Sequence, residues 1–226
     1  MIPEILAAIL AAVIAITLHE AAHGYAADAL GDPTARLLGR VSLNPLRHVD
    51  PVGTLLVPGI LLVTQLLTIG RVEAMFGWAK PVPVDLRRLY NPRWGMMWVA
   101  LAGPGMNVLL AFVAALCAHL AGLLDGDAAT LLYRCVALFM VVNLVLAVFN
   151  MLPIPPLDGG RVVTALLPLQ LARPYAGLER FGLLIVLGLL LVAPRLSPEL
   201  DVMGWALREI VAPVFSFLLR AAGHPV

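Results

Sequence analysis

The sequence predicts an all-α polytopic membrane protein with about five to six transmembrane helices. Of its 226 residues, 61% are hydrophobic and only 13% are charged, whereas an ordinary soluble domain has about 25% charged residues. Several apolar runs reach the roughly 20 residues that a ~30 Å hydrocarbon core requires. The linkers between them are rich in proline, glycine and arginine, so they cannot continue the helices. No basic run with interleaved aromatic residues is present, and we expect no nucleic-acid partner.

Six segments follow one another as candidate membrane helices. Four of them are largely apolar, namely Ile2 to Tyr25, Trp94 to Leu124, Ala128 to Leu152 and Leu178 to Ala193. The other two are interrupted, Val52 to Ile69 by Pro58 and Gly59, and Met203 to Ala222 by Arg208, Glu209 and Pro213. Each of these two either spans the membrane or lies partly in the interface.

The chain is expected to form one membrane-embedded domain over residues 1–226, with a core over 1–161 and C-terminal helices over 162–226. Within the linkers, Arg40 to Leu43 and Lys80 to Val84 are expected to be short extended or β-hairpin pieces. Such a piece could offer a strand edge to an unwound substrate segment. An ordinary interfacial loop is an equally good interpretation of either piece.

The first apolar segment contains the sequence HEAAH, His19 to His23. Residues i and i+4 share one face of a helix, so the two imidazoles can bind one metal ion. Glu20 lies about 100° around the helix from His19, where a general base for metal-bound water belongs. Because a charged residue within hydrocarbon costs about 2.5–3.5 kcal/mol on insertion scales, this cluster indicates a function.

A catalytic zinc site usually has three protein ligands and one open position, so a third ligand is needed. Asp158 is the best candidate. It lies in NMLPIPPLDGGR, where prolines end a helix and two glycines allow the backbone to bend around a site. Two alternatives stay open, because Asp158 could instead cap a helix that begins near Gly159 or pair with Arg161.

Three motifs together resemble the site-2 protease family of intramembrane zinc metalloproteases: HEAAH, ALAGPGMN from Ala100 to Asn107, and NMLPIPPLDGGR. The resemblance is closest to small members that lack a PDZ or CBS domain. It implies the following residue roles: one Zn²⁺ bound by His19, His23 and Asp158, water activated by Glu20, and substrate bound by Asn150. Asn107 is a second candidate for substrate binding, which either lines the same cavity or merely joins two helices.

The resemblance also implies a substrate class. Site-2 proteases cleave transmembrane segments of single-pass proteins in regulated intramembrane proteolysis, and the implied substrates are anti-sigma factors, membrane-anchored regulators and signal-peptide remnants. A membrane metal-binding protein or transporter that uses the same His/Asp cluster is an alternative, and a non-catalytic scaffold is another. Glu20 separates the first two possibilities, because only a protease needs it as a base.

The topology follows from the metal site. If the three ligands bind one ion, an even number of crossings separates HEAAH from Asp158, so Val52 to Ile69 should enter the membrane and return, with a turn near Pro58 and Gly59. Most basic residues then share one side, namely Arg36, Arg40, Arg47, Arg71, Lys80, Arg87, Arg88 and Arg93. By the positive-inside rule this side is cytoplasmic, which places the N-terminus outside a plasma membrane and the site towards the cytoplasm.

Overall fold

The computed structural model describes residues 2–68, 70 and 77–225, which are largely helical and contain no β-strand. Below, α marks α-helices, and η marks 3-10 and π-helical segments. The elements of the N-terminal half are α1 (Ile2–Ala29), α2 (Thr34–Leu37), η1 (Pro45–His48), η2 (Pro51–Leu56), α3 (Val57–Thr68), α4 (Pro92–Cys117) and η3 (Ala118–Leu123). Those of the C-terminal half are α5 (Gly126–Asn150), α6 (Asp158–Leu166), α7 (Leu169–Ala176), η4 (Gly177–Phe181), α8 (Gly182–Leu187), η5 (Gly188–Val192), α9 (Ala193–Leu196), η6 (Pro198–Leu200), α10 (Val202–Ala206), η7 (Leu207–Val211) and α11 (Ala212–Ala221).

Six helical stretches are long and apolar enough to cross a membrane, which confirms the predicted all-α polytopic class. They are Leu6–Ala29, Pro51–Thr68, Pro92–Leu123, Gly126–Asn150, Leu169–Leu196 and Val202–Ala221. The fifth stretch begins at Leu169, earlier than the predicted Leu178, because α7 and η4 join α8 without a break. Arg173 and Pro174, which precede the predicted start, concealed this extension in the sequence.

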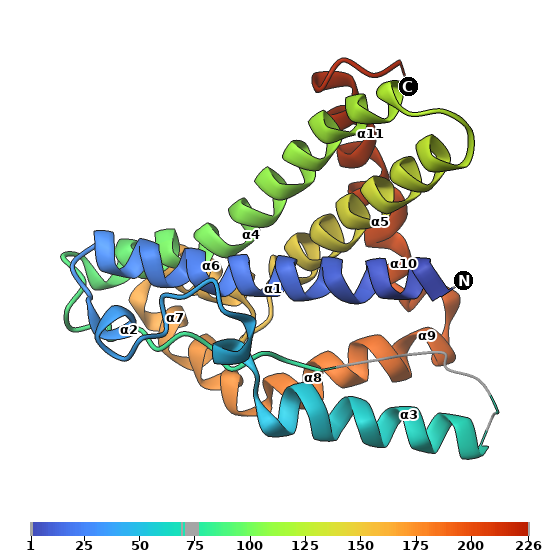
Figure 1. Cartoon of the computed structure of the whole chain (residues 1–226). Coiled ribbons are helices and arrows are strands. Elements are labelled where there is room, and N and C mark those ends of the chain that lie inside the picture. Colours follow the sequence, from blue (N-terminus) through green and yellow to red (C-terminus); the bar gives the residue numbers. More distant parts are fainter. Residues whose placement is uncertain (1, 69, 71–76, 226) are drawn as a thin grey trace.

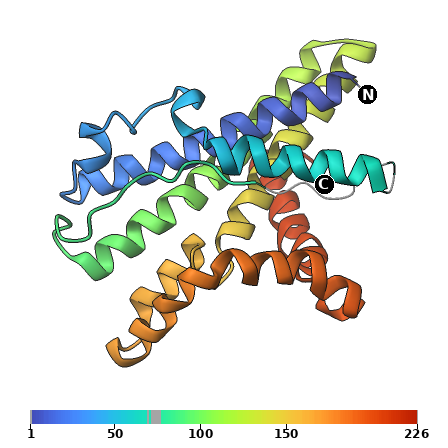
Figure 2. The same cartoon turned by 90° about the horizontal axis from the view of Figure 1, so that it is seen from below.

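Helices α1, α4 and α5 pack against one another, and α6 packs against α4. Figure 1 shows α4 and α5 rising side by side from α1, with α3 and the α8–α9 stretch on the other side of α1. Seen from below in Figure 2, the stretch that includes α8 and α9 diverges from this group. Small residues such as Ala15, Ala111 and Ala147 are buried between the helices. Small side chains permit the close approach on which helix association in lipid depends.

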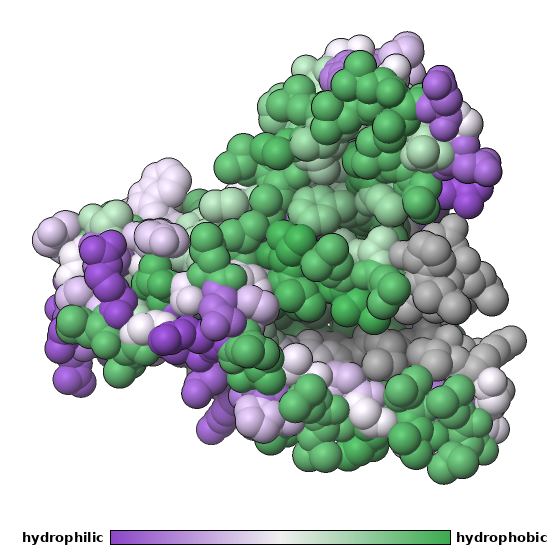
Figure 3. All heavy atoms as spheres, in the orientation of Figure 1, coloured by the Kyte–Doolittle hydropathy of each residue, from purple (hydrophilic) through white to green (hydrophobic). Residues whose placement is uncertain are grey.

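The surface separates into apolar and polar parts. In Figure 3, hydrophobic residues cover most of the visible face, and hydrophilic residues gather around α2 and near the start of α5. Large apolar side chains such as Leu6, Leu10 and Leu67 are exposed. An exposed apolar surface of this extent is what a lipid-facing protein presents.

The expected turn near Pro58 and Gly59 is wrong, because η2 and α3 form one continuous helix through both residues. Pro58 is tolerated because it directly follows the π-helical segment, and the Gly53 carbonyl, five residues earlier, accepts a hydrogen bond from outside the helix. The main-chain N–H of Trp78 nevertheless donates to the carbonyl of Gly53 at 3.0 Å. The chain therefore leaves and rejoins the bundle at the start of this helix, which is compatible with an even number of crossings. Residues 69 and 71–76 lie outside the described part.

Residues 77–85 are extended but pair with no strand among the described residues, so a β-hairpin is not formed there. The prolines at positions 81 and 83 favour this extended backbone and cannot donate a hydrogen bond. The main-chain N–H of Lys80 donates to the carbonyl of His48 at 2.9 Å, and that of Val82 donates to the Glu20 carboxylate at 3.0 Å. These contacts hold the segment beside HEAAH. Residues 40–43 are likewise non-helical.

Candidate metal centre

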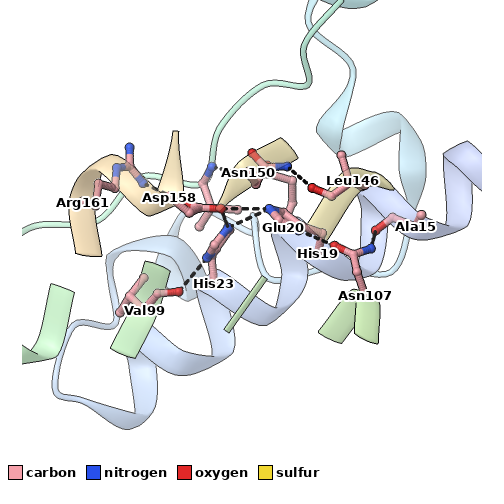
Figure 4. A network of polar contacts seen from close by, with 11 residues as sticks. Ala15, His19, Glu20, His23, Val99, Asn107, Leu146, Asn150, Asp158 and Arg161 are labelled. Atoms are coloured by element: carbon pink, nitrogen blue, oxygen red, sulfur yellow. Dashed lines mark hydrogen bonds and ion pairs between the residues drawn. The ribbon is translucent and has the colours of Figure 1, made fainter. Parts of the chain in front are cut away.

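His19, His23 and Asp158 converge where the C-terminal half of α1 meets the start of α6 (Figure 4). The two Nε2 atoms are 3.0 Å apart, and the Asp158 Oδ2 atom lies 3.2 Å from the Nε2 atom of His19 and 3.3 Å from that of His23. All three side chains are buried. The i, i+4 spacing on α1 and the start of a second helix thus bring three ligand atoms to one point.

The second nitrogen of each imidazole contacts α4. His19 Nδ1 lies 2.6 Å from the Asn107 Oδ1 atom, and His23 Nδ1 lies 2.7 Å from the carbonyl oxygen of Val99. The Asn107 amide nitrogen donates to the Ala15 carbonyl at 3.3 Å, which orients its oxygen towards His19. Because a carbonyl oxygen only accepts, the Nδ1 atoms carry the protons and both Nε2 atoms present lone pairs to Asp158.

This donor set suits zinc. Neutral imidazole nitrogen and carboxylate oxygen are among its common ligands. With bonds of about 2.0–2.1 Å, tetrahedral ligand atoms lie about 3.3–3.4 Å apart, close to the separations of 3.0, 3.2 and 3.3 Å here. Three acceptor atoms that share no proton repel one another at this range unless a cation lies among them. The cluster therefore fits one zinc ion with a fourth position open.

Asp158 reaches the imidazoles because two glycines let α6 approach the loop that follows α5. A Cβ atom on Gly159 would lie 2.5 Å from the Leu152 carbonyl oxygen, and one on Gly160 would lie 2.7 Å from the Ile154 carbonyl carbon. Both distances are too short for any real side chain. Glycine is therefore required at both positions because the two backbones approach closely, and not because of unusual torsion angles.

The contacts of Asp158 bear on the two alternatives left open by the sequence. Its Oδ2 atom faces the two imidazoles and not the first turn of α6. Its Oδ1 atom lies 3.9 Å from the Arg161 Nη1 atom, which is longer than a hydrogen bond. Neither capping nor pairing with Arg161 therefore accounts for the position of this carboxylate.

Glu20 lines a cavity of about 410 Å³ beside the cluster. Its carboxylate, which is half-buried, accepts the Val82 N–H through Oε2. Apolar side chains such as Phe149 and Leu183 form much of the cavity wall. A carboxylate next to the ligand cluster, in a cavity with room for a peptide segment, is positioned to exchange protons with a bound water.

The two asparagines that were expected to bind substrate lie in different environments. Asn150 lines the cavity, although its Nδ2 atom donates to the Leu146 carbonyl at 2.9 Å. Asn107 is fully buried and is not among the residues that line the cavity. Its amide contacts His19 and the Asn143 side chain. Because it does not reach the cavity, Asn107 is suited to orienting His19 and not to contacting a substrate.

Three further residues at this site were not predicted from the sequence. Val99 supplies a backbone carbonyl, which no side-chain pattern reveals. A Cβ atom on Gly103 would lie 2.5 Å from His23 Nε2 and 2.6 Å from His19 Nε2, so this glycine packs directly on both imidazoles. Asn143 is a fully buried amide that contacts Asn107. In the sequence, Asn143 could have been singled out as a polar residue within an apolar run.

Comparison with known proteins gives consistent matches. Residues 117–193 match the family described as Peptidase family M50. YwhC of Bacillus subtilis, named as a zinc metalloprotease, is 35% identical over 212 residues, which cover 92% of this chain and 90% of that protein. Rip2 of Mycolicibacterium smegmatis, also named as a zinc metalloprotease, is 28% identical over 187 residues, or 81% of this chain and 66% of Rip2. No solved structure matches the chain.

Proposed function

The chain belongs to Peptidase family M50, the site-2 protease family, and is thus a membrane zinc metallopeptidase, and on this premise we propose that it cleaves transmembrane segments of single-pass proteins. The observation that carries the proposal is the convergence of three zinc-type ligand atoms beside a cavity that Glu20 also lines. His19, His23 and Asp158 hold the zinc, and residues 1–226 act as one membrane-embedded unit.

The reaction assigned to this site is hydrolysis of a peptide bond. Bound zinc supplies a polarised water and a Lewis acid for the peptide carbonyl. Glu20 accepts a proton as the water oxygen bonds to the carbonyl carbon and the π electron pair moves to the carbonyl oxygen. When that pair returns, the C–N bond breaks, and the proton held by Glu20 passes to the amine nitrogen. The Val82 N–H fixes one oxygen of Glu20 and leaves the other for this transfer.

The substrate class proposed here is the membrane-anchored regulator, which includes anti-sigma factors, or the signal-peptide remnant. A transmembrane helix must unwind before cleavage, because its carbonyls are otherwise engaged in helical hydrogen bonds. The largely apolar cavity suits an unwound hydrophobic segment, and Asn150 contacts its backbone with the polar atoms that its bond to Leu146 leaves available.

The substrate class is tested by comparing the membrane proteomes of cells that carry the intact chain or Glu20→Gln. The proposal predicts single-pass fragments that are produced only with the intact chain, and uncleaved precursors that accumulate with the variant. Identical fragment sets would contradict it.

The orientation proposed for the protein places the metal centre towards the cytoplasm of a plasma membrane, with the N-terminus outside. The exposed Arg87 follows the extended segment near the site, whereas the exposed Asp127 lies in the first turn of α5, next to the connection from α4. In a chain whose Cys117 and Cys135 are replaced by alanine, we expect Arg87→Cys to react with an impermeant maleimide only in inverted vesicles. Asp127→Cys should react from outside intact cells, and the reverse pattern would contradict the orientation.

Asn107 is proposed as a positioning residue for His19. In Asn107→Ala the imidazole loses the acceptor that fixes its proton on Nδ1, so zinc affinity should fall by about 10–100-fold. Asn143→Ala removes only a contact of Asn107 and should have a smaller effect. Competition with a chelator measures both affinities, and equal zinc affinity in Asn107→Ala and the unmodified chain would refute the role.

A further inference from the structure

Arg161 is the only lysine or arginine among the described residues that line the cavity. It lies on α6, one turn after Asp158, and Figure 4 shows both side chains on the same side of that helix. Its side chain is 35% exposed. The function proposed above does not use this residue, although it lies next to the reacting groups.

Structural contacts among the described residues leave the Arg161 guanidinium free to bind another group. Its one ion-pair contact among the described residues is the Asp158 Oδ1 atom at 3.9 Å, whereas hydrogen bonds between nitrogen and oxygen span about 2.7–3.2 Å. A guanidinium carries five N–H donors in a rigid fork, and they remain available to a molecule in the cavity. A cation beside largely apolar cavity walls is costly to retain without a function.

The chemistry of peptide hydrolysis provides a partner for it. The substrate carbonyl oxygen acquires negative charge when the water oxygen bonds to the carbonyl carbon, and a fixed charged donor stabilises that charge more than it stabilises the neutral carbonyl. Asn150 is less suited to this task, because its amide nitrogen already donates to Leu146.

We propose that Arg161 is a catalytic residue that donates a hydrogen bond from its guanidinium to the carbonyl oxygen of the scissile peptide as negative charge develops there. No proton leaves Arg161 in this step. The inference rests on the proposed proteolytic function, and it concerns the charge on the substrate and not the binding of zinc.

The test uses the purified full-length chain, zinc-loaded, and as substrate a single-pass precursor that accumulates with Glu20→Gln in the proteome comparison. Arg161→Met should lower kcat by about 10²–10³-fold, the usual effect of removing such a donor. Zinc content should stay at the level of the unmodified chain and KM should change little. Arg161→Lys keeps a charge and should recover part of the lost rate. The matched control is Arg180→Met, because the Arg180 guanidinium lies over the Phe181 ring at 4.7 Å and is not among the cavity residues.

Three outcomes would overturn the inference. A kcat of Arg161→Met within about threefold of the unmodified chain would show that the donor is not used. Loss of zinc in that variant would show that Arg161 serves Asp158 instead. A rate for Arg161→Lys no higher than that of Arg161→Met, with both variants folded and zinc-loaded, would show that charge at this position is irrelevant. If the unmodified chain cleaves nothing, the proposed function itself fails, which is a separate result.

Discussion

Glu20→Gln is expected to abolish peptide hydrolysis while the protein keeps its zinc. Glutamine has the shape of glutamate, and its amide oxygen can still accept the Val82 N–H. It cannot accept a proton from water, however, and loss of a general base typically lowers a rate by about 10²–10⁴-fold. Glu20 is not one of the three converging ligand groups, so zinc binding should persist. The measurement is kcat on a substrate fragment together with zinc per chain.

The control for this variant is Glu209→Gln, which lies in η7, away from the cavity. Glu209→Gln should change neither kcat nor the amount of zinc per chain. Residual activity above about a tenth in Glu20→Gln would show that another group is the base. Absence of hydrolysis by both the unmodified chain and Glu20→Gln, together with zinc transport across a vesicle membrane, would favour the transporter alternative.

Gly103→Ala is expected to disrupt the metal centre without touching any ligand. The added methyl would lie 2.5 Å from His23 Nε2 and 2.6 Å from His19 Nε2, and real Cβ atoms essentially never lie this close to another heavy atom. The imidazoles cannot simply move away, because Asn107 and Val99 on the same helix hold their Nδ1 atoms. Either α4 separates from α1 or the Nε2 atoms leave their positions. Zinc affinity should then fall by at least the 10–100-fold typical of a disturbed outer shell.

Gly105→Ala is the matched control, because it lies on the same helix and a Cβ atom there meets nothing within 4 Å. Alanine also favours a helix over glycine by about 0.8–1.0 kcal/mol. Gly105→Ala should therefore retain zinc and unfold at an equal or higher temperature. If chelator competition gave the same zinc affinity for Gly103→Ala as for Gly105→Ala, the packing of α4 on the two imidazoles would be wrong.

The sequence indicated those parts of the site that depend on local spacing or on strongly polar residues in apolar runs. HEAAH requires only the helical period to place His19 and His23 together, and apolar length sufficed for the membrane helices. Asp158 was found because prolines and glycines surround it. In each case the signal lies within one continuous segment of the sequence.

The remaining features depend on which helices meet. Nothing near Asn107 in the sequence shows that it faces His19, 88 residues earlier, and Val99 contributes only backbone. The turn near Pro58 was predicted from the even number of crossings and from two residue types that break helices, whereas the helix continues through Pro58 and the Gly53 carbonyl is satisfied by Trp78. These features are therefore set by packing between helices that are distant in the sequence, and local sequence patterns do not reveal them.

The most direct test of the ligand set is the zinc K-edge absorption spectrum of the purified chain. We expect one zinc per chain, bound by two imidazole nitrogens and by oxygen at about 2.0–2.2 Å, with these shells lost in Asp158→Ala. A sulfur ligand at about 2.3 Å would assign the metal to Cys117 or Cys135. Such a shell, or a spectrum unchanged in Asp158→Ala, would contradict a centre built from His19, His23 and Asp158.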